Sequence, residues 1–211
     1  MKLYTYFRSS AAFRVRIALN LKGLKYQPLF VHLPKGEHRA AQYSEVNAQA
    51  LLPTLELDDG TRLTQSLAII EYLDEKHPEP HLIPKDAIAR ARVRSLALLV
   101  ACEIHPLNNL RVLQHLKREL GQSQEQIDTW YRHWVADGLA KLEAEISGGK
   151  GKFCHGDTPT MADCCLVPQI FNAKRYNSDL APYPTTLRIF EACMKLEAFD
   201  RAQPSKQPDA E

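Results

Sequence analysis

Two serines stand where the sequence pattern passes from strand to helix. Ser9 and Ser10 follow the apolar, strand-like residues 3–7 and precede a helical pattern over residues 11–21. At such a junction, backbone N–H groups without helical partners and the positive end of the helix dipole favour an anion. A hydroxyl there can also donate to a thiolate and lower the pKa of the thiol from its free value of about 8.5. For this segment alone, a plain helix cap is the more common role of a serine.

The elements around these serines alternate between strand and helix. Strands are expected over residues 3–7 and 26–31, on either side of the helix 11–21, which Gly23 closes. This spacing implies a parallel pair joined by a right-handed crossover. The other elements expected here are a short helix around 40–46, an extended run over 51–57, a hairpin turn at 58–61 and a helix over 66–76.

A proline-rich stretch over residues 77–84 marks a domain boundary. Helical patterns follow it over residues 87–120, with a break at Pro106, then over 124–146, from Thr160 onward, and over 185–196. The tail from Pro204 is expected to be loose. We therefore predict a small α/β domain over residues 1–80 and an all-helical domain over residues 86–211.

Composition excludes several classes of protein. The chain has 211 residues, 45% of them apolar and 25% charged, and a formal net charge of +2. This balance indicates a globular protein and argues against a nucleic-acid or membrane partner. The five cysteines contain no Cys-x-x-Cys pair, which argues against a disulfide framework and a metal site. With no signal-peptide pattern at the start, we expect a cytoplasmic protein.

Several segments together resemble one family, the zeta-class glutathione transferases, which include maleylacetoacetate and maleylpyruvate isomerases. The resemblance covers essentially the whole chain. The segments that carry it are Ser9-Ser10 with Arg14-Val15-Arg16-Ile17-Ala18-Leu19, Leu52-Pro53-Thr54-Leu55, Gln65-Ser66 with the helix after it, Ile104-His105-Pro106-Leu107-Asn108-Asn109, Gly156-Asp157 through Asp163, Leu166-Val167-Pro168-Gln169 and Gln207-Pro208-Asp209.

The resemblance implies the glutathione transferase fold, in which a thioredoxin-like N-terminal domain precedes an all-helical one. It also implies a homodimer and a cis peptide bond before Pro53. Many zeta members have cysteine at the position of Ala11. A thiol cannot therefore be required there in this protein, and the chemistry falls to Ser9 and Ser10.

Glutathione is the cofactor that the family implies, and its groups suggest roles for particular residues. Ser9 is expected to face the thiol, supported by Ser10 and the Ala11 amide, while Ser66 at a helix start holds the γ-glutamyl carboxylate beside Gln65. The Leu52 backbone can pair with the cysteinyl peptide unit like an added strand. The remaining residues that the resemblance places at glutathione are His38, Gln49, His105 and Asn109.

The implied reaction is a cis–trans isomerisation of a maleyl keto-acid to its fumaryl isomer in aromatic catabolism. Reversible addition of the thiolate to the conjugated double bond allows rotation, and elimination restores a trans alkene. The substrate is a small dicarboxylate, and the arginines that resemble family positions for it are Arg8, Arg111 and Arg175. Arginine suits this role because its planar fork binds carboxylates in a bidentate way. Arg111 resembles the residue found in some bacterial maleylpyruvate-type members, which slightly favours maleylpyruvate over maleylacetoacetate as the substrate.

Two other functions remain open from the sequence. The same serine site would serve a zeta-type transferase that displaces halide from small α-halo acids. A glutathione-transferase-like binding protein without catalysis is the second alternative, and the presence of Ser9-Ser10 and Gln65-Ser66 argues against it. Asp157 and Asp163 are expected to be structural, bracing a buried helix.

Overall fold

The computed structural model describes residues 1–211, which form two compact units. Unit 1 comprises Met1–Ile83 together with Met194–Glu211, and unit 2 comprises Pro84–Cys193. Both ends of the chain therefore build unit 1. Met194–Glu211 falls within the expected helical domain of residues 86–211, but its contacts lie within unit 1.

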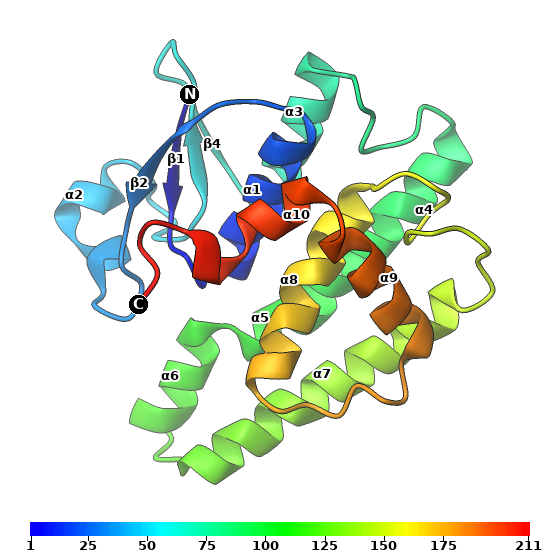
Figure 1. The fold of residues 1–211 in the computed structure, drawn as a ribbon. Helices are drawn as coiled ribbons and strands as arrows, with labels where there is room; N and C mark the ends of the chain where they lie inside the picture. The colour runs from blue at the N-terminus through cyan, green and yellow to red at the C-terminus, as the bar shows by residue number, and fades with distance from the viewer. The chain divides into compact units, whose positions relative to one another are not determined.

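Unit 1 contains a mixed four-stranded sheet in the order β2-β1-β3-β4 (Figure 1). The strands are β1 (Lys2–Thr5), β2 (Gln27–Phe30), β3 (Thr54–Glu56) and β4 (Arg62–Thr64). β1 and β2 are parallel, and the other two pairings are antiparallel. Gly60, with φ of 85°, lies in the turn between β3 and β4. The expected parallel pair and hairpin are both confirmed.

Helices cover this sheet because its two faces are both partly apolar. The helices of unit 1 are α1 (Ser10–Leu21), α2 (Ala41–Ser44), α3 (Ser66–Lys76) and α10 (Glu197–Ala202), with short 3₁₀ turns η1 (Glu37–Arg39) and η3 (Pro204–Lys206). The paired residues Leu3 and Leu55 are fully buried on the face where α1 and α3 pack together. On the opposite face, the Tyr4 ring lies 5.7 Å from the ring of Tyr43 in α2.

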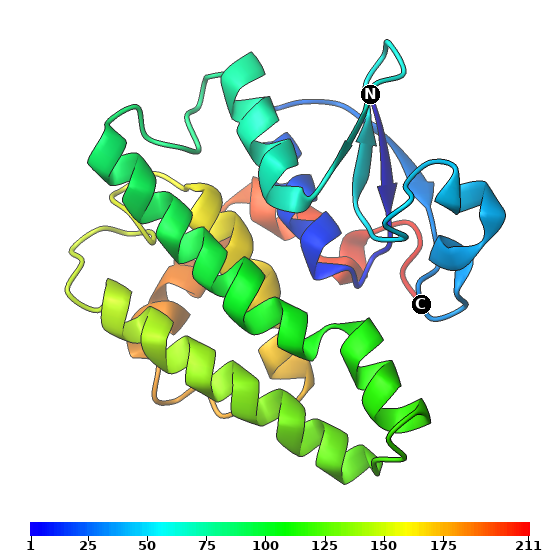
Figure 2. The same cartoon turned by 180° about the vertical axis from the view of Figure 1, so that it is seen from behind.

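The tail after residue 203 is ordered, which corrects the expectation of a loose end. α10 packs beside α1, as Figures 1 and 2 both show. Pro204 in η3 is buried, and Asp209 accepts a hydrogen bond from the Phe7 backbone N–H at 2.9 Å. The polar composition of the tail favours exposure to solvent, but its carboxylates at Asp209 and Glu211 bond to Phe7 and His32 near the start of the chain.

Unit 2 is entirely helical in its regular structure. Its helices are α4 (Ala87–Leu98), η2 (Leu99–Ile104, a π-helix), α5 (His105–Asn108), α6 (Leu110–Arg118), α7 (Gln124–Ile146), α8 (Met161–Arg175) and α9 (Pro184–Met194). Figure 2 shows α4 and α7 side by side. The expected helices over residues 66–76 and 124–146 have the bounds of α3 and α7.

The expected break at Pro106 is wrong. The helical path passes through Pro106, which lies in the first turn of α5, and breaks at Asn109, where the backbone is extended. Pro106, which has no N–H to donate, follows closely on the π-helix η2, where the backbone hydrogen bonding is already irregular. The register change is made by the π-helix η2 immediately before it, and η2 packs against α7.

Asp163 braces the start of α8, as the sequence indicated. Its Oδ2 accepts hydrogen bonds from the Thr160 N–H at 2.7 Å and the Thr160 hydroxyl at 2.8 Å, and its Oδ1 accepts from the Cys154 N–H at 2.8 Å. This is the capping box expected from the Thr160 and Asp163 spacing. Cys164 and Cys165 on the same helix are fully buried, as expected for small apolar residues.

None of the helices is long and apolar enough to cross a membrane. The structure also brings together no group of three or more His, Cys, Asp or Glu side chains that could hold a metal ion.

Candidate active site

Ser9 is the N-cap of α1. Its backbone is extended, and its Oγ accepts a hydrogen bond from the Ala12 N–H at 3.2 Å. A hydroxyl that accepts through a lone pair still has its hydrogen to donate. Capping and donation to a thiolate are therefore compatible at Ser9. Only 8% of its surface is exposed, so a hydrogen bond there faces little competition from water.

The residues after Ser9 form the first turn of α1. Ser10 is the first helical residue and is buried, and Ala11 is the second. The Ala11 N–H belongs to the turn in which backbone donors have no intrahelical carbonyl. These N–H groups and the helix dipole favour negative charge beside Ser9.

The start of α3 provides a second place for an anion. Ser66 is the first residue of α3, and Gln65 is the N-cap residue. The Ser66 Oγ accepts a hydrogen bond from Nη1 of Arg14 at 3.3 Å. Gln65 has a left-handed backbone, with φ of 67°, and its Nε2 donates to the Oε1 of Gln49 at 2.7 Å. The structure thus brings Gln49, Gln65 and Ser66 together.

The peptide bond between Leu52 and Pro53 is cis, as the resemblance implied. β3 begins only at Thr54, so the backbone groups of Leu52 lie outside the ladder with β1. The preceding carbonyl of Leu51 is held by the Tyr43 hydroxyl at 2.7 Å and by Nδ2 of Asn47 at 2.8 Å. This loop therefore offers a fixed, unpaired backbone edge.

The apolar cluster under this loop links it to the serine turn. Leu52 packs with Tyr6 and Phe7, which come just before Ser9, and with Val31 and Tyr43. The backbone edge at Leu52 and the hydroxyl of Ser9 are thus carried by neighbouring parts of unit 1.

His38 is a buried histidine on η1, with 9% of its surface exposed. Its Nδ1 is buried without a hydrogen-bond partner. Burial lowers the pKa of His38 below its ordinary value of 6.5, and the charge of Arg39 lowers it further. The ring is therefore neutral near pH 7 and keeps an unused polar atom for a ligand.

In unit 2, the predicted site residues lie on or beside three helices. His105 begins α5 directly after the π-helix η2, an irregularity that is frequent at functional sites. The Asn109 side chain caps α6 by accepting from the Val112 N–H at 3.3 Å. This gives Asn109 a structural role that the sequence did not assign to it. Arg111 is exposed in the first turn of α6.

None of the three predicted substrate arginines forms an ion pair with a carboxylate of the chain. The guanidinium of Arg8 lies 4.8 Å from the centre of the Phe7 ring. The guanidinium of Arg175, at the end of α8, lies 4.9 Å from the ring centre of Tyr176, which stacks on Tyr131. Such cation–π contacts orient an arginine while leaving its N–H groups available.

Two buried residues stand in the sequence motifs without an assigned role, Arg14 in unit 1 and Asn108 in unit 2. Arg14 is 3% exposed on α1 and places its positive charge beside Ser66. Asn108 is 4% exposed, and both polar atoms of its side chain lack a partner. A buried unpaired amide is costly, which marks it as a candidate for contact with a ligand. The sequence signal for Arg14 is an arginine among apolar residues of α1, a signal that Arg16 shares.

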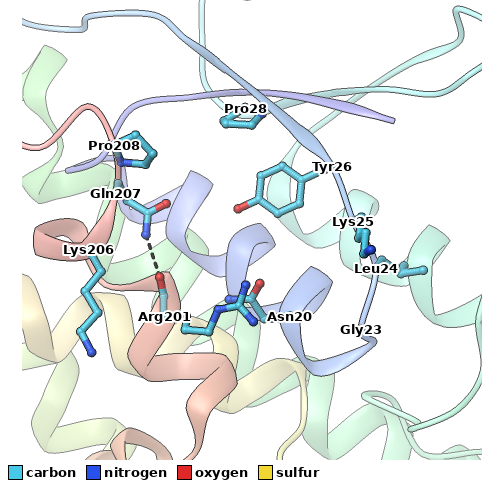
Figure 3. Close-up of a pocket in the computed structure, with 10 residues that line it drawn as sticks. All are labelled: Asn20, Gly23, Leu24, Lys25, Tyr26, Pro28, Arg201, Lys206, Gln207 and Pro208. Atoms are coloured by element: carbon cyan, nitrogen blue, oxygen red, sulfur yellow. Dashed lines mark hydrogen bonds between the residues drawn. The ribbon is translucent and has the colours of Figure 1, made fainter.

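A cavity of about 740 Å³ lies elsewhere in unit 1 (Figure 3). None of the predicted site residues lines it; its lining consists of Asn20, Gly23, Leu24, Lys25, Tyr26, Pro28, Arg201, Lys206, Gln207 and Pro208. Two of its cations are already paired, Arg201 with Glu197 and Lys206 with Asp200. We therefore keep the candidate site at Ser9, Leu52 and Ser66.

Family models match both parts of the chain. Residues 3–81 match the N-terminal domain of glutathione S-transferase, and residues 124–201 match its C-terminal domain. The chain belongs to the glutathione S-transferase family. Its place in the zeta class follows from a solved holo structure of a bacterial zeta-class maleylpyruvate isomerase, which is 46% identical over all of both chains with a TM-score of 0.97.

Two further members of this family show the same full-length likeness. The maleylpyruvate isomerase of a Ralstonia species is 46% identical over all of both chains. The maleylacetoacetate isomerase of Methylobacterium extorquens, solved with bound malonate and glutathione, is 42% identical over all of both chains with a TM-score of 0.96. The expected glutathione transferase fold, a thioredoxin-like N-terminal domain followed by a helical one, is thereby confirmed.

Proposed function

We propose that this protein is a glutathione-dependent cis–trans isomerase that converts a maleyl keto-acid, such as maleylpyruvate or maleylacetoacetate, to its fumaryl isomer. The observation that carries the proposal is Ser9, a buried hydroxyl at the N-terminus of α1 whose hydrogen remains free for donation. The full-length relatives named as isomerases of these two acids support the same reaction.

The residues of unit 1 fit glutathione. A carboxylate suits the N-terminus of α3, where Ser66 is joined by the buried cation Arg14. The peptide suits the free backbone edge at Leu52, and His38 offers an unpaired ring nitrogen. We assign the remaining contacts to Gln49 and Gln65 and, from unit 2, to His105 and Asn109.

Glutathione, when bound, supplies a thiolate that adds reversibly to the cis double bond so that this bond can rotate. Ser9 donates its hydroxyl hydrogen to the sulfur and holds the thiol deprotonated, because the charged form gains a hydrogen bond. The first-turn N–H groups at Ser10 and Ala11 add positive potential at the same point. None of these groups has to reorganise during the reaction, since α1 fixes them.

The substrate's two carboxylates need cations that are not already neutralised. We assign this role to Arg8, Arg111 and Arg175, none of which pairs with a carboxylate of the chain. An arginine that holds one carboxylate fixes one end of the substrate, while the other end swings about the former double bond to a second arginine.

We further propose that the domain of residues 1–80 provides most of the glutathione site and that the domain of residues 86–211, apart from its last segment, provides most of the substrate site. We also propose that the protein is a cytoplasmic homodimer. The family supports the dimer, and the five cysteines, none of which is in a disulfide bond, suit a reducing compartment. Light scattering after size exclusion tests the dimer, and a mass of 24.0 kDa, that of one chain, would contradict it.

Ser9→Ala tests the proposed function most sharply. We expect kcat to fall at least about a hundredfold, as for loss of an oxyanion donor, while glutathione still binds. Loss of the cap costs about 1 kcal/mol of stability in addition.

Ser123→Ala is the matched control, because the Ser123 Oγ caps α7 in the same way but lies outside the site. It should lose similar stability and no activity. Unchanged turnover in Ser9→Ala would remove Ser9 from the mechanism, and a larger loss in Ser10→Ala would transfer its role to Ser10.

A further inference from the structure

The closing motif Gln207-Pro208-Asp209 has no role in the reaction as derived above, yet the structure returns it to the serine turn. We propose that Asp209 is a positioning residue, whose carboxylate holds the Phe7 N–H and thereby sets where the Ser9 hydroxyl lies. This inference rests on the proposed function, because it assumes that Ser9 faces the thiol.

The segment of residues 6–9 joins the end of β1 to the start of α1. The Ser9 N–H donates to the Tyr6 carbonyl at 2.9 Å, which closes the segment into a tight turn. The Phe7 N–H within that turn donates to Oδ2 of Asp209 at 2.9 Å. The Asp209 carboxylate thus accepts from the Phe7 N–H, two residues before Ser9, although the two residues are 202 positions apart in the chain.

The carbonyls of the same turn are held from the opposite side by Arg16. Its Nη1 donates to the Tyr6 carbonyl at 3.3 Å, and its Nη2 donates to the Phe7 carbonyl at 3.0 Å. Its Nε donates to the carbonyl of Ala202, at the end of α10, at 3.1 Å. Arg16 is fully buried, and therefore these bonds are shielded from water.

Charge links the two clamps. Burial lowers the pKa of Arg16 to about 10, and the nearby Tyr26 and the Asp209 carboxylate oppose this shift. The carboxylate thus helps keep the buried guanidinium charged while it holds the turn. The second carboxylate oxygen of Asp209, Oδ1, is buried without a hydrogen-bond partner, which costs stability. The bond to Phe7 uses only Oδ2, so this cost is not explained by the turn.

The tail delivers Asp209 in a fixed position. Nε2 of Gln207 donates to the carbonyls of Arg201 and Gln203, each at 2.9 Å, and the first of these bonds is drawn in Figure 3. Pro208 lies between Gln207 and Asp209 and restricts the backbone there. The last residue, Glu211, pairs with the partly buried His32 at 2.9 Å and forms no hydrogen bond with the backbone of the turn.

A small displacement of Ser9 is expected to matter more for chemistry than for binding. A shift of about 1 Å in a reacting group can cost on the order of a hundredfold in rate. Gln65 and Ser66, two of the proposed binding contacts, form no hydrogen bond with Asp209, and Leu52 is joined to it only indirectly, through packing on Phe7. We therefore expect Asp209→Ala to lower kcat about tenfold and to raise the pKa of the bound thiol, with the KM for glutathione changed less than about twofold.

The test compares the full chain with Asp209→Ala, Asp209→Asn and, as control, Glu211→Gln, which removes a carboxylate from the same tail. The readouts are kcat, the KM for glutathione, ultraviolet titration of the bound thiolate and amide hydrogen exchange at Phe7. We expect faster Phe7 exchange and a raised thiol pKa in Asp209→Ala. Asp209→Asn should restore most of both, because its amide oxygen can still accept from Phe7.

Two results would overturn the proposal. One is normal Phe7 exchange and normal thiol titration in a folded Asp209→Ala. The other is an equal loss of kcat in Asp209→Ala and Asp209→Asn, accompanied by a lowered Tm and by no change in Phe7 exchange or thiol titration. That result would mean that the loss comes from general destabilisation. Ser9→Ala in parallel separates this failure from failure of the proposed function: full activity there rejects the site, whereas an inactive Ser9→Ala beside a normal Asp209→Ala rejects the positioning alone.

Discussion

At the scale of single residues, the buried arginines of α1 explain how a polar site is built on an apolar domain. Arg14 carries charge to Ser66, and Arg16 binds the carbonyls of Tyr6 and Phe7 in the turn before Ser9. Both are nearly or fully buried, although their neighbours form the core. The buried guanidinium of Arg16 is tolerable because it makes four hydrogen bonds at once. Arg14 makes one, to Ser66, and its buried Nε has no partner.

The substrate arginines can be tested one at a time. Arg111→Ala should raise the KM for the dicarboxylate about tenfold and the KM for glutathione much less, because a bidentate carboxylate contact is lost. Steady-state kinetics with each compound varied in turn checks this. Arg118→Ala, an exposed arginine in the last turn of the same helix, is the control. Equal rises in the two KM values would mean that Arg111 does not hold the substrate.

His38 predicts a pH dependence of stability. Its pKa in the folded protein is lowered by burial, whereas the unfolded chain takes up a proton near the ordinary value of 6.5. The unfolded state therefore binds more protons below about pH 6.5, and stability falls as the pH drops through that range.

Thermal unfolding between pH 7.5 and pH 5 checks this sign. The decline should be shallower in His38→Gln than in the wild type, and unchanged in His115→Gln, an exposed control. A decline of the same slope in His38→Gln would contradict the assignment.

At the scale of elements, local chemistry made most boundaries predictable. α7 starts at a Ser123 and Gln126 capping box and ends before Gly148, and its predicted bounds match the structure. The π-helix η2 was not predictable, because over six residues a π register leaves no pattern distinct from that of an α-helix. Its position depends on packing against α7, which is a non-local cause.

The fit between η2 and α7 gives a direct test. A Cβ added at Gly138 would lie 2.3 Å from Cγ1 of Ile104, the last residue of η2. Gly138→Ala should therefore lower the free energy of unfolding by about 1–3 kcal/mol through overpacking. Denaturant titration measures this change.

Two further variants decide whether the contact is the cause. Ile104→Ala in the same chain should recover part of the loss, because it opens space for the new methyl group. Gly148→Ala, which meets no atom within 4 Å, should be close to neutral. A neutral Gly138→Ala would show that η2 adjusts without cost.

At the scale of the whole molecule, the informative finding is that unit 1 needs both ends of the chain. The candidate site could be predicted on Ser9, Leu52 and Ser66, because each belongs to a motif next to a local structural signal. The packing of the tail against unit 1 could not be predicted, because the hydrogen bond between Phe7 and Asp209 joins residues that no sequence periodicity connects. Composition suggests solvation for such a polar tail, and only its tertiary contacts reverse that expectation.

The central claim is glutathione-dependent isomerisation, and its most direct test is turnover with glutathione far below the substrate concentration. Maleylpyruvate and maleylacetoacetate are each supplied to the purified protein, and substrate, product and free thiol are followed together. We predict complete conversion of at least one acid to its fumaryl isomer, no conversion with S-methylglutathione, and no net loss of thiol. Conversion that is independent of glutathione, conversion that consumes it mole for mole, or no conversion of either acid would contradict the account.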